Sequence, residues 1–119
     1  MPAMTFRELA EAVEENGGPD LAPVLGEALS LAGVGIPGGD AGPALGSTDA
    51  ALAVAASALP GWSIRLDGRA SVEHGHWRCV IRRSTSDDEV AYPGVGKSNR
   101  QARAVLAAML RALALRGAG

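Results

Sequence analysis

The fold is decided by residues 62–115, which read WSIRLDGRASVEHGHWRCVIRRSTSDDEVAYPGVGKSNRQARAVLAAMLRALAL. Apolar and polar side chains alternate over residues 62–67, which predicts a strand with Trp62, Ile64 and Leu66 on one face. Residues 76–83 alternate in the same way and predict a second strand. These short periodic segments indicate a sheet built from strands that are neighbours in the sequence.

The second expected strand has one apolar and one basic face. The two faces carry Trp77, Cys79 and Ile81 on one side, and Arg78, Val80 and Arg82 on the other. A third strand is expected over residues 89–92 and ends at Pro93, because proline lacks the amide hydrogen that a ladder requires. Short connections between three successive strands favour an antiparallel meander.

A long amphipathic helix is expected after the basic turn 94–100, where Ser98 and Gln101 form a capping-box pattern. It ends near Arg116. Its buried side is predicted from apolar residues at helical spacing: Ala102, Val105, Leu106, Met109, Leu110 and Leu113. Its exposed side is expected to carry three arginines: Arg100, Arg103 and Arg111.

The N-terminal half is predicted to be helical. Thr5 and Glu8 form a capping box that begins a helix running to about Asn16, and Asp20 caps a second helix that ends near Ala32. Residues 47–59 form a third, Ala-rich helix, which ends before Pro60-Gly61. This third helix is nearly all apolar, so we expect it to be buried on most sides.

Residues 33–46 connect the second and third helices and contain six Gly and two Pro. This composition raises the entropy cost of regular structure and predicts a mobile connector. The alternative is an ordered loop laid over the fold, because Val34, Ile36 and Leu45 offer apolar anchors.

The sequence therefore predicts a single α+β domain over residues 1–119, since this length suits one modest core. The sheet is a three-stranded antiparallel meander, with the long C-terminal helix and the helical N-terminal half packed on it. Along the chain we expect an acidic helical segment at 1–32, a Gly/Pro-rich connector at 33–46 and an α-β-β-β-α unit at 47–116.

The net charge of −2 conceals two oppositely charged halves. Residues 1–61 hold one basic and eight acidic residues, a balance of −7, whereas residues 62–119 hold ten basic and five acidic residues, a balance of +5. This asymmetry indicates either an interaction surface for a charged partner or two halves that face each other in one fold.

The sequence contains no convincing catalytic or metal-binding motif. Residues 94–98 resemble the end of a phosphate-binding loop, but Ala91 stands where that motif needs Gly, and Pro93 removes an amide. His74 and His76 lack further ligands at metal-binding spacing. Cys79 lies on the apolar face of its strand, where a thiol is usually inert. We therefore expect no enzymatic activity, no metal and no cofactor.

The single cysteine excludes an intramolecular disulfide, which fits a reducing compartment. The N-terminus has no signal-peptide pattern, and no apolar run reaches about 18 residues. These features predict a cytoplasmic protein without membrane segments.

Several stretches together resemble a family of small phage proteins. They are the acidic first helix, the turn at 16–20, the run STDAALAV at 47–54, the LPGW corner at 59–62, the WRC triplet at 77–79 and the closing helix at 102–113. In these features the chain resembles the bacteriophage and prophage proteins grouped as the phage ABA sandwich domain. That family has no settled activity, and its name implies helices on both faces of a sheet.

Residues 49–113 are also similar to a double-stranded RNA-binding domain, whose last helix opens with Gly-x-Gly-x-Ser and spaced basic residues. The matching residues are Gly94, Gly96, Ser98, Arg100 and Arg103, with His74 or His76 near the loop that enters a minor groove in that family. Asn99 replaces the first Lys of the basic cluster, and a pI near 5.6 opposes phosphate binding.

The resemblance to phage proteins implies a small non-enzymatic accessory protein that binds a host macromolecule, a protein or ribonucleoprotein complex. Inhibition of a host defence complex, of the anti-CRISPR type, is the specific expectation, and binding of double-stranded nucleic acid is the alternative. We expect no membrane and no small-molecule substrate as partner. The expected partner-binding residues are Arg78, Arg82, Asp87, Asp88, Glu89, Lys97, Arg100 and Arg103.

Overall fold

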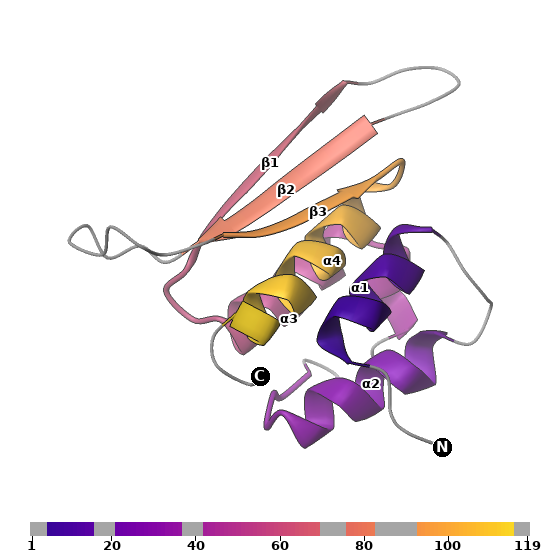
Figure 1. Ribbon diagram of the computed structural model, residues 1–119, viewed down its shortest axis with the longest axis vertical. Helices are drawn as coiled ribbons and strands as arrows, with labels where there is room; N and C mark the ends of the chain where they lie inside the picture. Colours follow the sequence, from indigo (N-terminus) through magenta and orange to yellow (C-terminus); the bar gives the residue numbers. More distant parts are fainter. Residues whose placement is uncertain (1–4, 16–20, 37–41, 70–75, 83–92, 116–119) are drawn as a thin grey trace.

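The computed structural model describes residues 5–15, 21–36, 42–69, 76–82 and 93–115. The elements in chain order are α1 (Phe6–Glu14), α2 (Leu21–Leu31), the 3-10 helix η2 (Gly42–Leu45), α3 (Thr48–Ala58), β1 (Ser63–Arg69), β2 (His76–Arg82), β3 (Gly94–Ser98) and α4 (Gln101–Leu113). The predicted α+β class is confirmed, and Figure 1 shows α4 packed against the sheet.

The three strands form an antiparallel sheet in the order β1-β2-β3, which confirms the predicted meander. The register pairs Leu66 with Cys79, and Cys79 with Gly96, so these three residues share one row across the sheet. This row belongs to the inner face, which is the face turned toward α4.

The prediction of a turn over residues 94–98 was wrong. Residues 94–98, which the sequence suggested as a turn, form β3, and the expected strand at 89–92 lies outside the described residues. The glycines explain the error, because glycine is rare in strand interiors unless another backbone approaches closely. A Cβ on Gly94 would overlap the carbonyl oxygen of Ala108, and a Cβ on Gly96 would overlap that of Ala104. These glycines therefore let α4 lie directly on the β3 backbone.

The described helices lie on one side of the sheet (Figure 1). The first helix layer is α4, which packs against β3 and β2, and α1 and α3 pack on α4. The described part of the chain therefore lacks the helices on both faces that the phage-family resemblance implies. No described helix covers the opposite face, which we call the outer face.

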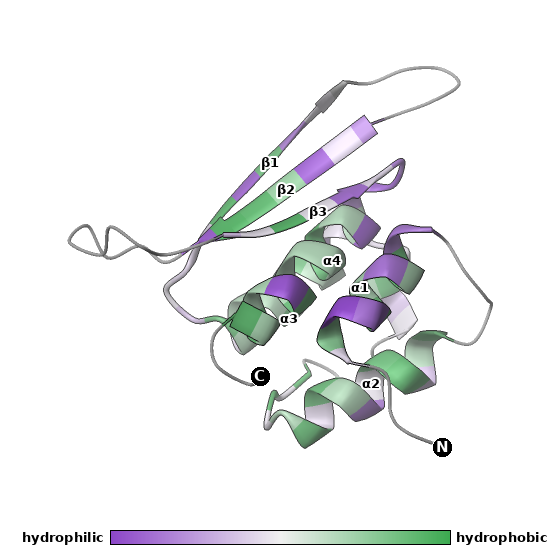
Figure 2. Cartoon of the chain, viewed as in Figure 1, coloured by the Kyte–Doolittle hydropathy of each residue, from purple (hydrophilic) through white to green (hydrophobic). Residues whose placement is uncertain are grey.

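The core is centred on α4, whose buried residues lie on almost every side of the helix. In Figure 2, α4 is largely hydrophobic, whereas β1 alternates between hydrophilic and hydrophobic residues. The expected exposed side of α4 is wrong for Arg103 and Arg111, which are half-buried, and holds for Arg100. Helix α3 is less buried than expected, because Ala53, Ala56 and Ser57 are exposed.

The helix caps follow the predictions in part. At α1, the Glu8 amide donates to Thr5 Oγ1 at 3.0 Å and the Thr5 amide donates to Glu8 Oε1 at 2.8 Å, so this capping box is confirmed. The capping box expected at α4 is wrong. Arg100 is the N-cap there without a side-chain cap bond, and Gln101 Oε1 accepts a hydrogen bond from Thr48 of α3 at 3.1 Å.

The described ends of the 33–46 segment pack on the fold. Val34, Ile36 and Leu45 are partly buried against the core, and Ser57 Oγ donates to the Gly35 carbonyl oxygen at 2.7 Å. Within η2, Ala44 is buried. For these residues the contacts favour the ordered-loop alternative, and residues 37–41 lie outside the described part of the chain.

Candidate binding face

The outer face of the sheet is exposed and basic. Alternation along the three strands places on it the side chains of Arg65, Asp67, Arg78, Val80, Arg82, Val95 and Lys97. Asp67 is the one acidic residue among these. The outer face is therefore strongly positive on a chain whose net charge is −2.

The register arranges these side chains in rows. Asp67, Arg78 and Lys97 form one row, and Arg65, Val80 and Val95 form the next. Both valines are half-buried. The result is a small apolar centre bordered by cations, an arrangement that combines apolar contact with charge recognition.

The cations of the outer face are exposed to solvent. Arg65 Nε lies 2.9 Å from Asp67 Oδ2, but these side chains retain 79% and 58% of their exposure, so the pair contributes little stability. Because the side chains of Arg65, Arg78, Arg82 and Lys97 are exposed, a partner can reach them.

A groove lies at the end of the sheet beside the outer face. Its apolar wall is Trp77, whose ring lies against Gly68 so closely that a Cβ on this glycine would overlap it. The groove is lined further by Asp67, His76, Arg78, Lys97, Ser98 and Asn99. Trp77 belongs to the inner face, so the described outer face carries no aromatic side chain.

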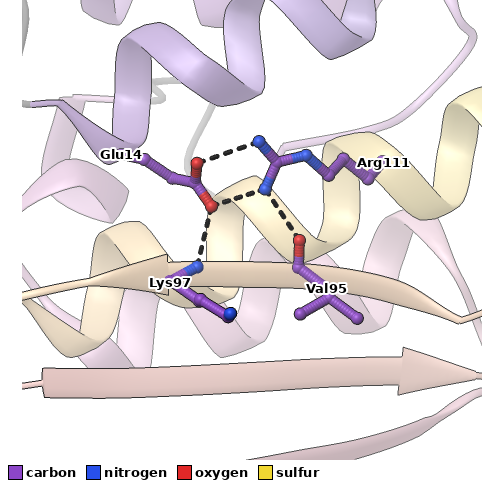
Figure 3. A network of polar contacts seen from close by, with 4 residues as sticks. All are labelled: Glu14, Val95, Lys97 and Arg111. Carbon is purple, nitrogen blue, oxygen red and sulfur yellow. Dashed lines mark hydrogen bonds and ion pairs between the residues drawn. The ribbon is translucent and has the colours of Figure 1, made fainter.

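The edge of β3 is occupied by an ion pair between α1 and α4 (Figure 3). Arg111 Nη2 lies 2.9 Å from Glu14 Oε1, and Arg111 Nη1 donates both to Glu14 Oε2 and, at 2.7 Å, to the Val95 carbonyl oxygen. Glu14 Oε2 also accepts the Lys97 amide at 2.7 Å. The pair thus satisfies backbone groups that another strand would otherwise bond.

The electrostatics of this network favour the charged forms. Burial alone would raise the pKa of Glu14, but hydrogen bonds from Arg111 and from the Lys97 amide, together with the positive charges of the Arg111 and Lys97 side chains, hold this pKa below its usual value. The hydrogen bond to Glu14 raises the pKa of Arg111 despite the opposing effect of burial. This ion pair links the acidic and basic halves, as one of the two interpretations of the charge asymmetry predicts.

Arg103 is directed toward α1 rather than toward solvent. Its Nη1 donates to the Val13 carbonyl oxygen at 3.2 Å, in the last turn of α1, where helical carbonyls lack partners within the helix. Its Nε is buried without a hydrogen-bond partner in the described structure. Burial, with the nearby charge of Arg100, lowers the pKa of Arg103. Arg103 therefore joins two helices.

The structure separates the residues expected to bind a partner. Arg78, Arg82 and Lys97 lie together on the outer face, and Arg100 is exposed at the start of α4. Arg103 lies against α1, and Asp87, Asp88 and Glu89 lie outside the described residues. Sequence reasoning missed Arg65 and Asp67, although the alternation over residues 62–67 already placed them opposite the apolar face.

The described residues offer little for catalysis or metal binding. Burial raises the pKa of Cys79 to about 11, so its thiol stays protonated and poorly nucleophilic at neutral pH. No group of three or more His, Cys, Asp or Glu among the described residues is placed to hold a metal ion. None of the described helices has the length and apolar character needed to span a bilayer.

Comparison with known proteins found no matching family model, no matching curated protein and no matching solved structure.

Proposed function

We propose that this protein acts by binding, without catalysis, and that its outer face contacts an acidic surface of a macromolecular partner. The supporting observation is the uncovered outer face, where Arg65, Arg78, Arg82 and Lys97 are exposed around two half-buried valines. This face carries four positive charges and one negative charge, that of Asp67, so it attracts an acidic surface. The two valines supply apolar contact.

The chemistry of this face favours a protein surface over nucleic acid. Sheets that bind single strands stack bases on aromatic side chains, and the described outer face has none. The double-stranded RNA-binding pattern uses basic residues at the start of the last helix, but here Arg103 bonds the Val13 carbonyl. Lys97 and Arg100 remain exposed there, which keeps duplex binding as the second candidate.

The resemblance to phage proteins suggests the class of partner. Proteins of that kind act inside a bacterial host, so the proposed partner is a cytoplasmic host protein or ribonucleoprotein complex. Inhibition of a defence complex of the CRISPR type is the specific form of this proposal. The outer face would then occupy a site on that complex that normally receives a basic ligand.

A capture experiment tests this proposal with matched variants. The wild-type chain and the Arg78→Glu/Arg82→Glu variant are immobilised and exposed to host lysate, and bound proteins are quantified by mass spectrometry. Arg7→Glu is the control, because Arg7 is also an exposed arginine but lies on α1. We expect the same partner with the wild type and the control, and at least a tenfold loss with the double variant. Equal recovery of the partner by the wild type, the double variant and the control would show that the outer face is not the binding surface.

A titration with duplex RNA tests the second candidate. Phosphate contacts release counterions, so a duplex-binding module would bind at about 50 mM salt and weaken steeply by about 200 mM. We expect negligible binding at both concentrations. Tight, salt-sensitive binding that is lost in Arg100→Glu would instead establish the nucleic-acid function.

A further inference from the structure

The two edges of the sheet differ. The β3 edge is occupied by Glu14 and Arg111, as described above. At the other edge, β1 is the terminal strand, and no described strand pairs with the side of it that faces away from β2. Figure 1 shows β1 at the border of the sheet that is farthest from the helices. An uncovered edge can pair with a further strand.

The hydrogen bonds at the β3 edge indicate which backbone groups of β1 point away from β2. Val95 and Lys97 turn their backbone groups away from β2, so Gly96 turns its groups toward Cys79. Backbone groups of successive residues point alternately to the two sides of a strand. On β2, the groups of Arg78 and Val80 therefore point to β1.

The same alternation continues into β1. Arg65 and Asp67 lie opposite Val80 and Arg78, so their backbone groups bond β2. The amides and carbonyls of the intervening residues, Ile64, Leu66 and Gly68, consequently point to the uncovered edge.

The sequence of β1 is complementary to itself in one antiparallel register. If Leu66 of one copy pairs with Leu66 of a second copy, residue 64 lies opposite residue 68, and all three exposed residues form hydrogen-bonded pairs. Arg65 then lies opposite Asp67 of the second copy, in a non-hydrogen-bonded pair where side chains approach closely. By the two-fold symmetry this opposite-charge contact occurs twice.

The inner face of β1 also fits such a neighbour. Helix α4 packs mainly against β3 and β2, and Ile64 and Leu66 remain only half-buried. In the Leu66-centred register the two Leu66 side chains lie side by side on the inner face, where each covers apolar surface of the other.

From the edge geometry and the charge pattern, we infer that two copies of this chain pair through β1, antiparallel and centred on Leu66. The product joins the two described three-stranded sheets into one, with the described helices of both copies on one side and the two outer faces continuous. This inference does not depend on the proposed function, although such a dimer would double the basic surface offered to a partner.

A charge-exchange experiment tests both the pairing and its register. Wild type should sediment at low salt with twice the 12.0 kDa mass of one chain. Arg65→Asp places two like-charged pairs at the interface, and so does Asp67→Arg, so each variant should dimerise at least about tenfold more weakly. Both sites are exposed, so folding should be unchanged by circular dichroism. Arg7→Glu is the control and should dimerise like the wild type.

Two combinations restore the opposite charges. The double variant Arg65→Asp/Asp67→Arg is again complementary to itself and should regain the dimer. The two single variants are complementary to each other, so mixing them should produce a heterodimer from weakly associating chains. If the wild type and the charge variants form dimers with equal dissociation constants, the Leu66-centred register is wrong. A wild type that stays monomeric at all accessible concentrations would contradict the pairing of two copies. The free edge of β1 would then be a site for an extended segment of another protein.

Discussion

Glu14 and Arg111, separated by 97 positions in the chain, meet at the edge of β3 and bond the backbone of that strand. Glu14 accepts the Lys97 amide and Arg111 donates to the Val95 carbonyl, so the ion pair occupies the place of a neighbouring strand (Figure 3). It also joins α1 to α4. One contact therefore closes a sheet edge and fixes the N-terminal helix on the core.

Removing Glu14 should destabilise the fold. Glu14→Ala leaves the Lys97 amide and the half-buried Arg111 guanidinium without their acceptor, and a lost hydrogen bond to a charged group costs about 1.5–3 kcal/mol. The measurement is the free energy of unfolding from urea titrations. Glu15→Ala is the control, because Glu15 is exposed and should change stability by less than about 0.5 kcal/mol. Equal free energies of unfolding for the two variants would show that the Glu14–Arg111 pair contributes nothing to stability.

The same pair should make stability depend on pH. The pKa of Glu14 is held below its usual value of 4.5 in the folded state, so the unfolded chain takes up this proton first. Its contribution is therefore complete above about pH 4.5 and is lost as the pH falls through the folded-state pKa. The stability difference between wild type and Glu14→Gln should shrink over this acidic range. A difference that stays constant from pH 7 to pH 3 would contradict the assigned shift.

The contact between β3 and α4 should not tolerate a methyl group. In Gly96→Ala the added Cβ meets the backbone of Ala104 and Ala108, and relieving this overlap should cost about 1–3 kcal/mol. At Gly35 a Cβ has open space, so Gly35→Ala serves as the control and should be neutral or slightly stabilising. Thermal unfolding of both variants measures the difference. Equal melting temperatures would mean that α4 does not lie on the β3 backbone.

The sequence predicted the elements whose side chains have a clear period. Alternation identified most of β1 and β2 and placed Arg78 and Arg82 on the face opposite the core. Helical spacing identified α4, and the Thr5 capping box marked the start of α1. These signals are local, so they are readable without knowledge of the tertiary structure.

The features that were missed depend on contacts between distant residues. Gly94 and Gly96 have no side chain to reveal a strand, and their role appears only when α4 lies against them. Periodicity placed Arg103 opposite the apolar stripe of α4, but α1 covers that side. The pairing of Glu14 with Arg111 has no local signal at all.

The claim that the outer face binds a partner is tested most directly by methyl NMR of valine-labelled protein, alone and with the captured partner. Val80 and Val95 lie on the outer face, Val24 is exposed on α2, and Val54 and Val105 are buried references. We predict that binding shifts the methyl signals of Val80 and Val95 and transfers saturation to them from the partner, while Val24 is unaffected. Perturbation of Val24 with unchanged Val80 and Val95 would contradict the account and place the binding surface on the helices.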